Sequence, residues 1–446
     1  MSSALALGCA MDTTEAEAET GAGLAELRQG DACSGTVSSE RAGQLDTSFG
    51  AAGTGIARLR FGADDDGGFF DLDVIDDGIV AAGWGQGGLG QIRFRVARLT
   101  EAGAPDLGFG GSGMVTTSWA ASTADAAYAT TVGHQRDGDI VAMGWRDRFR
   151  DESANFALAR YNPDGSLDQE GFGAGGKTLI DLGKEDEILD GVVLPNDRIL
   201  VVGKRGERIV IARLTADGDL DRSFARPDGY RTVLVGNGSA AHGVAVDQSG
   251  RIIVVGFADM GGQRDMVVLR LSSNGALDRS FGEGGQVVVG DPAIDERAVA
   301  VALSPDGRIV VAGDAGAEGA RDFQVRRFLR NGSPDLAFGN AGVARAPITA
   351  GDDQAEDMAL LPGGDVLVVG NRLDGGDGQP LLARYTCSGA LDPSFSEGGV
   401  LALDLGEYGV AHTVRMYSDD RVLIGGGDVG ATPGPGTYGV VARLWL

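Results

Sequence analysis

The chain has 446 residues, with 38 Lys and Arg against 64 Asp and Glu, so its formal net charge is −26 and its sequence pI is near 4.4. A surface this acidic repels a phosphate backbone, which argues against nucleic acid as a partner. No run of 18 or more apolar residues occurs in these 446 residues, which excludes a membrane-spanning helix among them, and the 75 glycines indicate many tight turns.

The first 42 residues are predicted to lie outside the folded body. Leu5 to Cys9 reads LALGC and resembles the end of a bacterial lipoprotein signal, in which the Cys carries the lipid. The basic part and most of the apolar part of such a signal are missing, so either the start is truncated or the match arises by chance. Residues 10–42 are polar and acidic without a period-2 apolar pattern, which predicts a flexible tether.

The lipoprotein resemblance implies an extracytoplasmic protein, either an outer-membrane lipoprotein or a secreted one, whose membrane contact is a lipid anchor on Cys9. Cys33 and Cys387 are then the remaining cysteines. They either form a disulfide in an oxidising compartment or stay as two unpaired thiols.

A unit of about 57 residues then recurs seven times from Gly43 to Leu446. Each unit has a turn and a β-branched run ending in Gly, as in DGRIVVAG at 306–313, then an alternating strand ending in Arg, as in FQVRR at 323–327, and then a loop such as LDRSFG at 277–282. A turn in front of a Val/Ile run is a hairpin signal. The Phe of the loop recurs at Phe49, Phe109, Phe172, Phe224, Phe281, Phe338 and Phe395.

Each unit is predicted to hold four strands, because two further short apolar stretches lie between the Phe loop and the next turn, for example 287–289 and 298–303. No helical periodicity occurs in the body of the chain. Four short strands in each of seven units favour an all-β fold, a seven-bladed β-propeller of four-stranded blades. The alternative is a right-handed β-solenoid, which usually has a shorter period and one turn per repeat.

The combination of SPDGRIVVAG at 304–313, DFQVRRF at 322–328 and LDRSFG at 277–282 resembles the delta-60-repeat family of bacterial propeller-like proteins, over nearly all of residues 43–446. The resemblance implies a propeller found mainly in secreted or surface proteins. It brings no established catalytic residues with it.

In six units the in-register Arg is followed eight residues later by the Asp of the Phe loop. The pairs are Arg98 and Asp106, Arg160 and Asp168, Arg213 and Asp221, Arg270 and Asp278, Arg327 and Asp335, and Arg384 and Asp392. Arg443 has no such Asp after it, and Asp46 in the first Phe loop has no such Arg before it. We therefore predict that Arg443 pairs with Asp46, and that a strand at about 54–61 completes the last blade, whose other three strands are C-terminal. The pairs are predicted to be structural, and the seven Phe to be wedges between blades.

Two patterns that look like ligand motifs are interpreted as parts of the repeat. Gly171 to Thr178 matches the phosphate-binding pattern GxxxxGK[ST], but a strand, and not the required helix, is expected after it. Asp217, Asp219 and Asp221 are spaced like the start of a calcium loop that lacks its Gly and its distal Glu. Solvated turn carboxylates are favoured there, with bound calcium as the alternative, and no cofactor or other metal is predicted.

The least uniform register of the repeat is expected to begin the innermost strand of each blade, beside the central channel. Propellers commonly bind small ligands at the mouth of this channel. The candidate ligand-binding residues at this register and the next position are His242, His412, Glu356, Asp71, Asp190 and Asp357. The alternative is that they are polar residues satisfied by channel water. No Ser/His/Asp or Cys/His pattern identifies a catalytic residue.

Three long loops also depart from the repeat, at Trp84 to Ile92, Trp145 to Asn155 and Gly427 to Thr437. We expect a monomeric, non-catalytic, extracellular or surface-anchored scaffold that binds a protein, a carbohydrate or another small ligand through these loops or the channel mouth. The alternative is a hydrolase or lyase that acts on a polysaccharide through Asp, Glu and His residues of the channel mouth.

Overall fold

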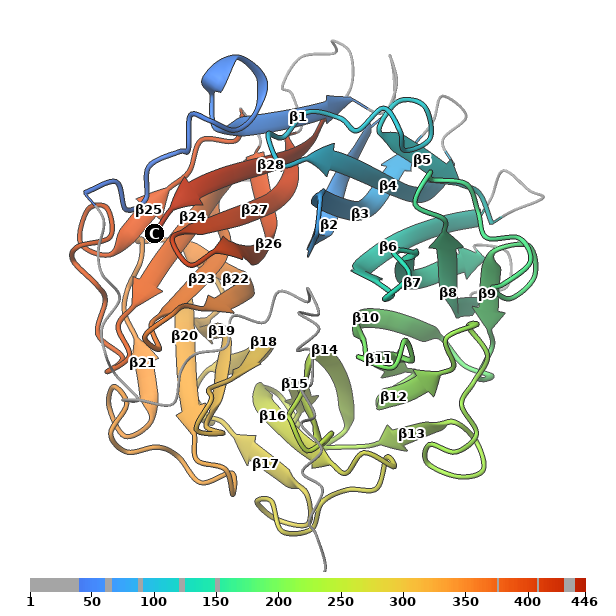
Figure 1. The fold of residues 1–446 in the computed structure, drawn as a ribbon. Helices are drawn as coiled ribbons and strands as arrows, with labels where there is room; N and C mark the ends of the chain where they lie inside the picture. Colours follow the sequence, from blue (N-terminus) through green and yellow to red (C-terminus); the bar gives the residue numbers. More distant parts are fainter. Residues whose placement is uncertain are drawn as a thin grey trace, which may run out of the picture.

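Short β-branched runs separated by Gly-containing turns form the strands β1 to β28 in the part of the chain that the computed structural model describes, residues 40–60, 66–86, 91–119, 125–148, 153–374, 377–406, 409–428 and 438–446. These strands form seven four-stranded antiparallel sheets arranged around a central axis (Figure 1). The predicted all-β, seven-bladed β-propeller is therefore confirmed. We number the blades 1 to 7 in chain order, so that blade 1 begins with β2 (Asp66–Ile75).

Within each blade the four strands follow one another from the channel outwards. The first strands of blades 1 to 7 are β2, β6 (Asp125–His134), β10 (Asp186–Val193), β14 (Gly238–Val246), β18 (Asp295–Leu303), β22 (Asp352–Leu360) and β26 (Gly409–Ser418). The second strands are β3 (Gly78–Gln86), β7 (Ile140–Arg148), β11 (Ile199–Arg205), β15 (Ile252–Asp259), β19 (Ile309–Ala317), β23 (Val366–Asp374) and β27 (Arg421–Asp428). The third strands are β4 (Ile92–Thr100), β8 (Ser153–Tyr161), β12 (Arg208–Leu214), β16 (Arg264–Leu271), β20 (Ala320–Phe328), β24 (Asp377–Tyr385) and β28 (Tyr438–Trp445). The fourth strands are β5 (Met114–Thr117), β9 (Lys177–Ile180), β13 (Tyr230–Val233), β17 (Gln286–Val289), β21 (Val343–Arg345), β25 (Val400–Ala402) and β1 (Ile56–Arg60), which follows the 3₁₀ helix η1 (Ala51–Gly53).

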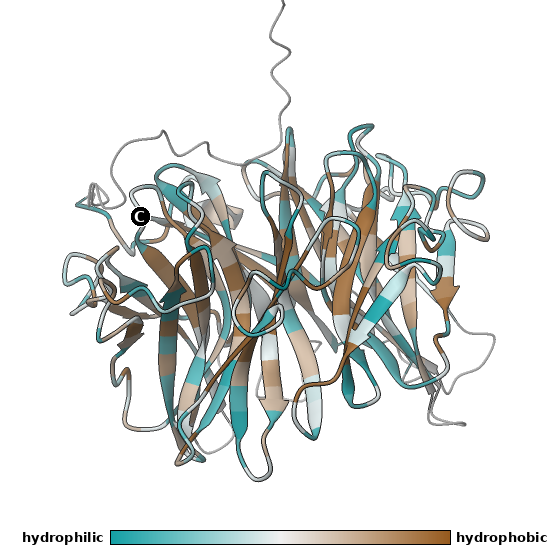
Figure 2. Cartoon of the chain, turned by 90° about the horizontal axis from the view of Figure 1, so that it is seen from below, coloured by the Kyte–Doolittle hydropathy of each residue, from teal (hydrophilic) through white to brown (hydrophobic). Residues whose placement is uncertain are grey.

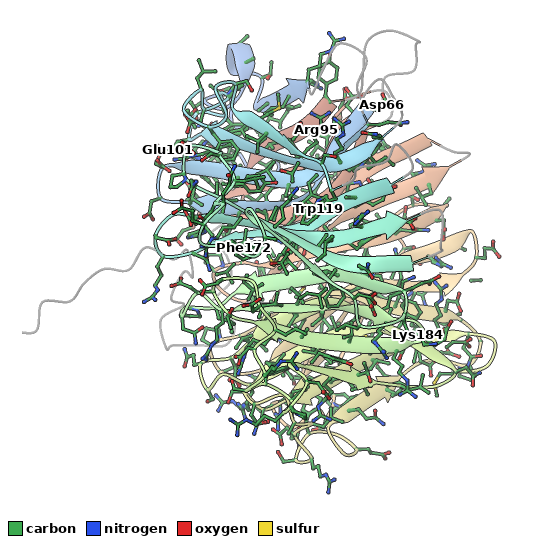
Figure 3. The ribbon with its side chains drawn as sticks, turned by 90° about the vertical axis from the view of Figure 1, so that its right-hand side faces the viewer. Asp66, Arg95, Glu101, Trp119, Phe172 and Lys184 are labelled. Carbon is green, nitrogen blue, oxygen red and sulfur yellow. The ribbon has the colours of Figure 1, made fainter. Side chains whose placement is uncertain are left out.

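The two faces of the ring carry different connections. The turns between first and second strands and the Phe loops between third and fourth strands form one face, which we call the turn face. The other connections form the opposite face, which we call the loop face. Figure 3 shows the two faces in side view, with Glu101 of a Phe loop on one side and with Asp66 and Lys184, at the entries to β2 and β10, on the other. No helix among the described residues is long and apolar enough to cross a membrane.

The ring closes in blade 7 as predicted. Strand β1 pairs antiparallel with β28, from Ile56 opposite Ala442 to Arg60 opposite Tyr438. Nε of Arg443 lies 2.8 Å from Oδ2 of Asp46, and both residues are at most 4% exposed. The N-terminal strand therefore completes a blade whose other three strands come from the C-terminal end of the chain.

The other six predicted Arg–Asp pairs are also present, with Nε to Oδ2 distances of 2.7–3.1 Å. The same arginines reach into the next blade: Nη1 of Arg213, for example, donates to the carbonyl of Ser273 at 2.7 Å. Equivalent bonds join five other repeat arginines to the carbonyls of Pro163, Ala216, Arg330, Cys387 and Glu101. Each of these arginines thus fixes its own Phe loop and holds the neighbouring one.

The seven Phe residues are wedges between blades, as predicted, and none is more than 1% exposed. Phe172 of blade 2, for example, packs in one cluster with Ile188 and Val201 of blade 3. The turn above it needs Gly218, because φ there is 88° and a Cβ would lie 2.6 Å from Cζ of Phe172. Figure 2 shows hydrophobic residues along the strands and hydrophilic residues on the connections, as expected if the core lies between blades.

Three sequence predictions lie outside the described residues: the lipid anchor on Cys9, the tether up to residue 39 and the disulfide partner Cys33. The same holds for the central parts of the three long loops, at 87–90, 149–152 and 429–437. Cys387 is disulfide-bonded, and its pairing with Cys33 stays a prediction.

The closure predicts that Asp46→Ala destabilises the ring by about 3 kcal/mol or more, because it leaves the charge of Arg443 buried without its carboxylate. Hydrogen exchange followed by mass spectrometry should show that Ile56–Arg60 loses protection first. Asp221→Ala is the matched control, since it removes an equivalent pair from a blade whose four strands are consecutive. Equal protection of β1 in both variants would contradict this role of the Arg443–Asp46 pair.

Candidate functional site

The seven innermost strands line a channel of about 3070 Å³. Its lining includes the turns between first and second strands, so it opens on the turn face. All six predicted ligand-binding residues, on blades 1, 3, 4, 6 and 7, line this single channel.

A β-bulge interrupts every innermost strand at the same register. In each blade one residue is skipped in the pairing with the second strand, as between Ala241 and Gly243, where His242 is the extra residue. The seven skipped residues, which we call the bulge ring, are Phe70, Thr130, Leu189, His242, Val299, Glu356 and His412. A bulge re-aims a side chain out of the regular pleat, which gives this register its special position.

The sequence expectation for this register was wrong in one respect. The register does not begin the innermost strand: β14, for example, begins at Gly238, four residues before His242. The bulge ring therefore lies within the channel and not at its mouth.

The glycines that end the β-branched runs lie opposite the bulges. A Cβ on Gly256 would sit 1.9 Å from the carbonyl oxygen of Ala240, so no other residue fits. The equivalent distance is 1.8–2.0 Å at Gly83, Gly144, Gly203, Gly313, Gly370 and Gly426. These glycines were the sequence signal for the bulge, which the strand pattern alone did not reveal.

The three aspartates that follow bulge residues tie neighbouring blades together. Oδ2 of Asp190 accepts the backbone N–H of Val244 in the next blade at 2.8 Å, while Oδ1 accepts that of Gly191. Asp71 and Asp357 make the same pair of bonds, to Val132 and Leu72 and to Val414 and Met358 respectively. Their carboxylates thus satisfy strand-edge N–H groups that would otherwise face the channel.

Arg415 joins two of these carboxylates across blade 7. Its Nη1 donates to Oδ2 of Asp357 at 2.5 Å, and its Nη2 donates to Oδ1 of Asp71. The hydroxyl of Thr413 lies within hydrogen-bond distance of both carboxylates. Although burial alone would lower the pKa of Arg415, the charges of Asp71 and Asp357 raise it above its ordinary value. Sequence reasoning missed Arg415, although it is the only Arg at its register.

Three bulge-ring side chains have no hydrogen-bond partner among the described residues: His242, Glu356 and His412. Burial lowers the pKa of His242 and of His412 to about 4, so both imidazoles are neutral at pH 7. Burial raises the pKa of Glu356 to about 7, against the opposing charge of Arg297. The ring of His412 lies edge-on to that of Phe70, with 5.1 Å between centroids.

Arg297 of blade 5 lines the channel near this group and was also missed from the sequence. Its Nε donates to Oδ2 of Asp314 at 2.6 Å, and Asp314 is 1% exposed. Its Nη2 lies 3.3 Å from the carbonyl of Ala355, the residue before Glu356. Arg297 lies on β18, between blades 4 and 6, and its charge contributes to the pKa shifts of both His242 and Glu356.

Asp190 and His134, which also line the channel, have shifted pKa values as well. Burial, and then the charge of Asp71, raise the pKa of Asp190 to about 7. Closer to the turn face, Nδ1 of His134 lies 2.6 Å from Oδ2 of Asp73, and this hydrogen bond raises the pKa of the imidazole. His134 is therefore held by a partner, unlike the two histidines of the bulge ring.

The described residues contain no group of three or more His, Cys, Asp or Glu side chains arranged to hold a metal ion. Calcium at an acidic loop stays the untested alternative to the favoured solvated turn carboxylates. The phosphate-loop pattern does run into a strand, since Lys177 is the first residue of β9. Its Nζ donates to the carbonyl of Ser118 at 3.2 Å.

Six segments of the chain match the model of a family described as a domain of unknown function (DUF5122), a β-propeller, at residues 76–109, 135–170, 194–224, 248–281, 304–338 and 362–395. Each segment runs from the first turn of a blade through its second and third strands to the Phe loop. The match supports the conclusion that the chain is built from repeats of a β-propeller family. No curated protein matches the sequence.

Several solved structures are similar to the chain at low sequence identity. A protein of unknown function from Dyadobacter fermentans is 12% identical, over 88% of this chain and 98% of its own, with a TM-score of 0.46. An ulvan lyase of polysaccharide lyase family PL25, bound to a GlcA–Rha3S saccharide, is 10% identical, over 86% and 95%, with a TM-score of 0.48. Polysaccharide lyase Uly1 is 10% identical, over 85% and 90%, with a TM-score of 0.47.

The geometry predicts that the three histidines of the chain titrate in two classes. His242 and His412 should stay neutral as the pH falls and take up a proton only near pH 4, whereas His134 should protonate above the ordinary pKa of 6.5. NMR of histidine labelled with ¹⁵N in the ring measures all three, with His→Ala variants for assignment. Ordinary titration of His242 or His412 near pH 6.5 would contradict their burial in the channel wall.

Proposed function

We propose that the protein is a non-catalytic binding scaffold whose channel takes a small polar ligand at the bulge ring. One observation carries this proposal: His242, Glu356 and His412 line the same channel, and none of them has a hydrogen-bond partner among the described residues. All three side chains are partly exposed and line the channel, so their polar atoms can bond to a ligand that enters it. Polar groups inside proteins normally have hydrogen-bond partners, which makes these three candidates for ligand contacts.

The aspartates around them have a different role in this proposal. Asp71, Asp190 and Asp357 already accept two backbone N–H bonds each, and two of them also pair with Arg415. They hold the strands that present the bulge ring. Of the six predicted binding residues, the two histidines and Glu356 are thus the ones proposed to contact a ligand.

The proposal also covers the cellular location, the oligomeric state and the partners of the scaffold. We place it outside the cytoplasm, as a lipoprotein anchored through Cys9 or as a secreted protein, and as a monomer. The long loops of the loop face are proposed to contact a protein or carbohydrate partner, which leaves the channel accessible from the turn face.

A polysaccharide-acting hydrolase or lyase is the second candidate, and the observation in its favour is that the pKa values of Glu356 and Asp190 are both raised to about 7. A carboxyl that is half protonated at neutral pH can act as a general acid. Glycoside hydrolysis generally needs a second carboxyl, and both oxygens of Asp190 accept backbone N–H bonds. Release of reducing ends or of unsaturated products from polysaccharides, abolished by Glu356→Gln, would establish this function instead.

A screen of metabolite-sized compounds tests the binding function, with the ring ¹⁵N signals of the histidines as reporters. A channel ligand should shift the signals of His242 and His412, and Glu356→Ala should weaken its binding about tenfold, the equivalent of about 1.4 kcal/mol. His134→Ala is the matched control, because His134 lines the same channel but already has Asp73 as a partner. Loss of binding in the His134 variant, with binding retained in the Glu356 variant, would contradict the proposed site.

The raised pKa of Glu356 predicts a pH-dependent gain of stability on removing its charge. Its pKa is about 7 in the folded protein against an ordinary value of 4.5, so the folded state holds more protons between these values. The stabilisation that comes from keeping Glu356 protonated is fully present below pH 4.5 and is lost as the pH rises through 7. Glu356→Gln should therefore raise the melting temperature at pH 8 by roughly 1–2 °C and change it little at pH 5.

Thermal denaturation of both proteins at the two pH values measures this difference. Glu283→Gln, at an exposed position of a Phe loop, is the control and should change neither value. The prediction fails if Glu356→Gln shifts the melting temperature equally at pH 5 and pH 8.

A further inference from the structure

We infer that the channel ligand is a neutral, hydroxyl-rich saccharide, and that it enters from the turn face. This inference rests on the proposed function and names the class of ligand that the bulge ring would take. Four observations carry it: the pairing of the fixed charges, the chemistry of the unpaired groups, the apolar part of the ring and the size of the channel.

The fixed charges near the ring are already paired. Both ends of the Arg415 guanidinium bind carboxylates, and Nε of Arg297 binds Asp314. Asp190 is tied to backbone N–H groups. An anionic ligand would meet these carboxylates and a net charge of −26, while a cationic ligand would meet the two guanidinium groups. The bulge ring therefore offers no free, fully ionised counter-ion to an anionic ligand or to a cationic one.

The unpaired groups can both donate and accept hydrogen bonds. A neutral imidazole has one N–H donor and one acceptor nitrogen, and a carboxyl that is half protonated offers both functions as well. His412 and Glu356 lie on neighbouring blades, 7 and 6, and His242 lies on blade 4. Each hydroxyl group of a sugar is likewise a donor and an acceptor, so saccharide hydroxyls match this set without any charge.

The rest of the bulge ring is largely apolar. Phe70, Leu189 and Val299 occupy blades 1, 3 and 5, and Phe70 stands next to His412. A sugar ring has apolar C–H faces and polar edges, so it can place its faces on these side chains and its hydroxyls on the polar ones. Sites for organic ligands commonly combine an apolar wall with a few placed polar groups.

The size of the channel favours several sugar units. Its volume of about 3070 Å³ exceeds the roughly 300–1,000 Å³ that is typical of sites for drug-sized molecules. Because the channel opens on the turn face and the bulge ring lies within it, the ligand is best described as the end of an oligosaccharide chain inserted along the axis.

Ring ¹⁵N NMR of the full chain tests the ligand class with defined probes: cellotetraose, maltotetraose and chitotetraose as neutral saccharides, tetragalacturonate as an anion and spermidine as a cation. We expect at least one neutral tetrasaccharide to shift the signals of His242 and His412 and to leave that of His134 unchanged. The double variant Glu356→Ala, His412→Ala should weaken this binding at least tenfold, whereas His134→Ala should bind as the wild type does. Circular dichroism confirms that each variant is folded.

The outcomes separate this inference from the proposed function. If tetragalacturonate or spermidine shifts the two histidine signals and no neutral tetrasaccharide does, the saccharide inference is overturned while a binding channel stands. If neutral saccharides bind but shift neither histidine, both are overturned, because binding then lies elsewhere. If no probe and no compound of the wider screen shifts either signal, the channel is not a ligand site.

Discussion

The contact between blades is the constraint on which the rest of this structure depends. Within a blade the strands are held by ladder hydrogen bonds, but neighbouring blades share no ladder, so the junctions rely on single backbone hydrogen bonds between loops and on side chains that reach across. The repeat supplies these as one unit: an Arg that binds the Asp of its own loop, in six blades a donated bond from that Arg to the next loop, and a Phe buried in the junction. In blade 7 the unit is split between the two ends of the chain, because Asp46 comes from the N-terminal loop and Arg443 from the last strand. The same interaction that repeats around the ring therefore also closes it.

A second repeated constraint creates the candidate site. Each second strand carries a Gly where a Cβ would strike the carbonyl of the innermost strand, as Gly256 does at Ala240, and the bulge follows directly. The Gly and the bulge are the same in all seven blades, but the residue on the bulge differs from blade to blade. A uniform backbone thus displays one variable side chain per blade at a single level of the channel. The scaffold and the chemistry of the site are encoded at separate positions of the repeat, so that the second can change without the first.

The sequence predicted the parts of the molecule that follow from its period. Register alone identified the seven blades, the Arg–Asp pairs, the Phe wedges and the pairing of Arg443 with Asp46, because equivalent positions of a repeat have equivalent surroundings. It also gathered six residues that do line one channel. It could not separate Asp190, tied to the N–H of Val244, from Glu356, which has no bond among the described residues, since the difference depends on the backbone of the next blade. It missed Arg415, whose bond to Asp71 joins residues 344 positions apart, and Arg297, whose charge acts on two other blades.

The charges in the channel distinguish the residues that hold the blades together from the residues that are available to a ligand. Arg415, Asp71 and Asp357 form a closed set of ion pairs in blades 6, 7 and 1, centred on blade 7, which the two ends of the chain complete. Removing Arg415 would leave the carboxylates of both Asp71 and Asp357 without their counter-charge. The bulge ring one position away carries no such set: the raised pKa of Glu356 reduces stability as the pH rises through 7, and the lowered pKa values of His242 and His412 reduce it as the pH falls below 6.5. A ring fastened by seven equivalent junctions tolerates that cost in a single layer. The layer is consequently free to be arranged for a ligand, because no junction between blades depends on the three unpaired side chains.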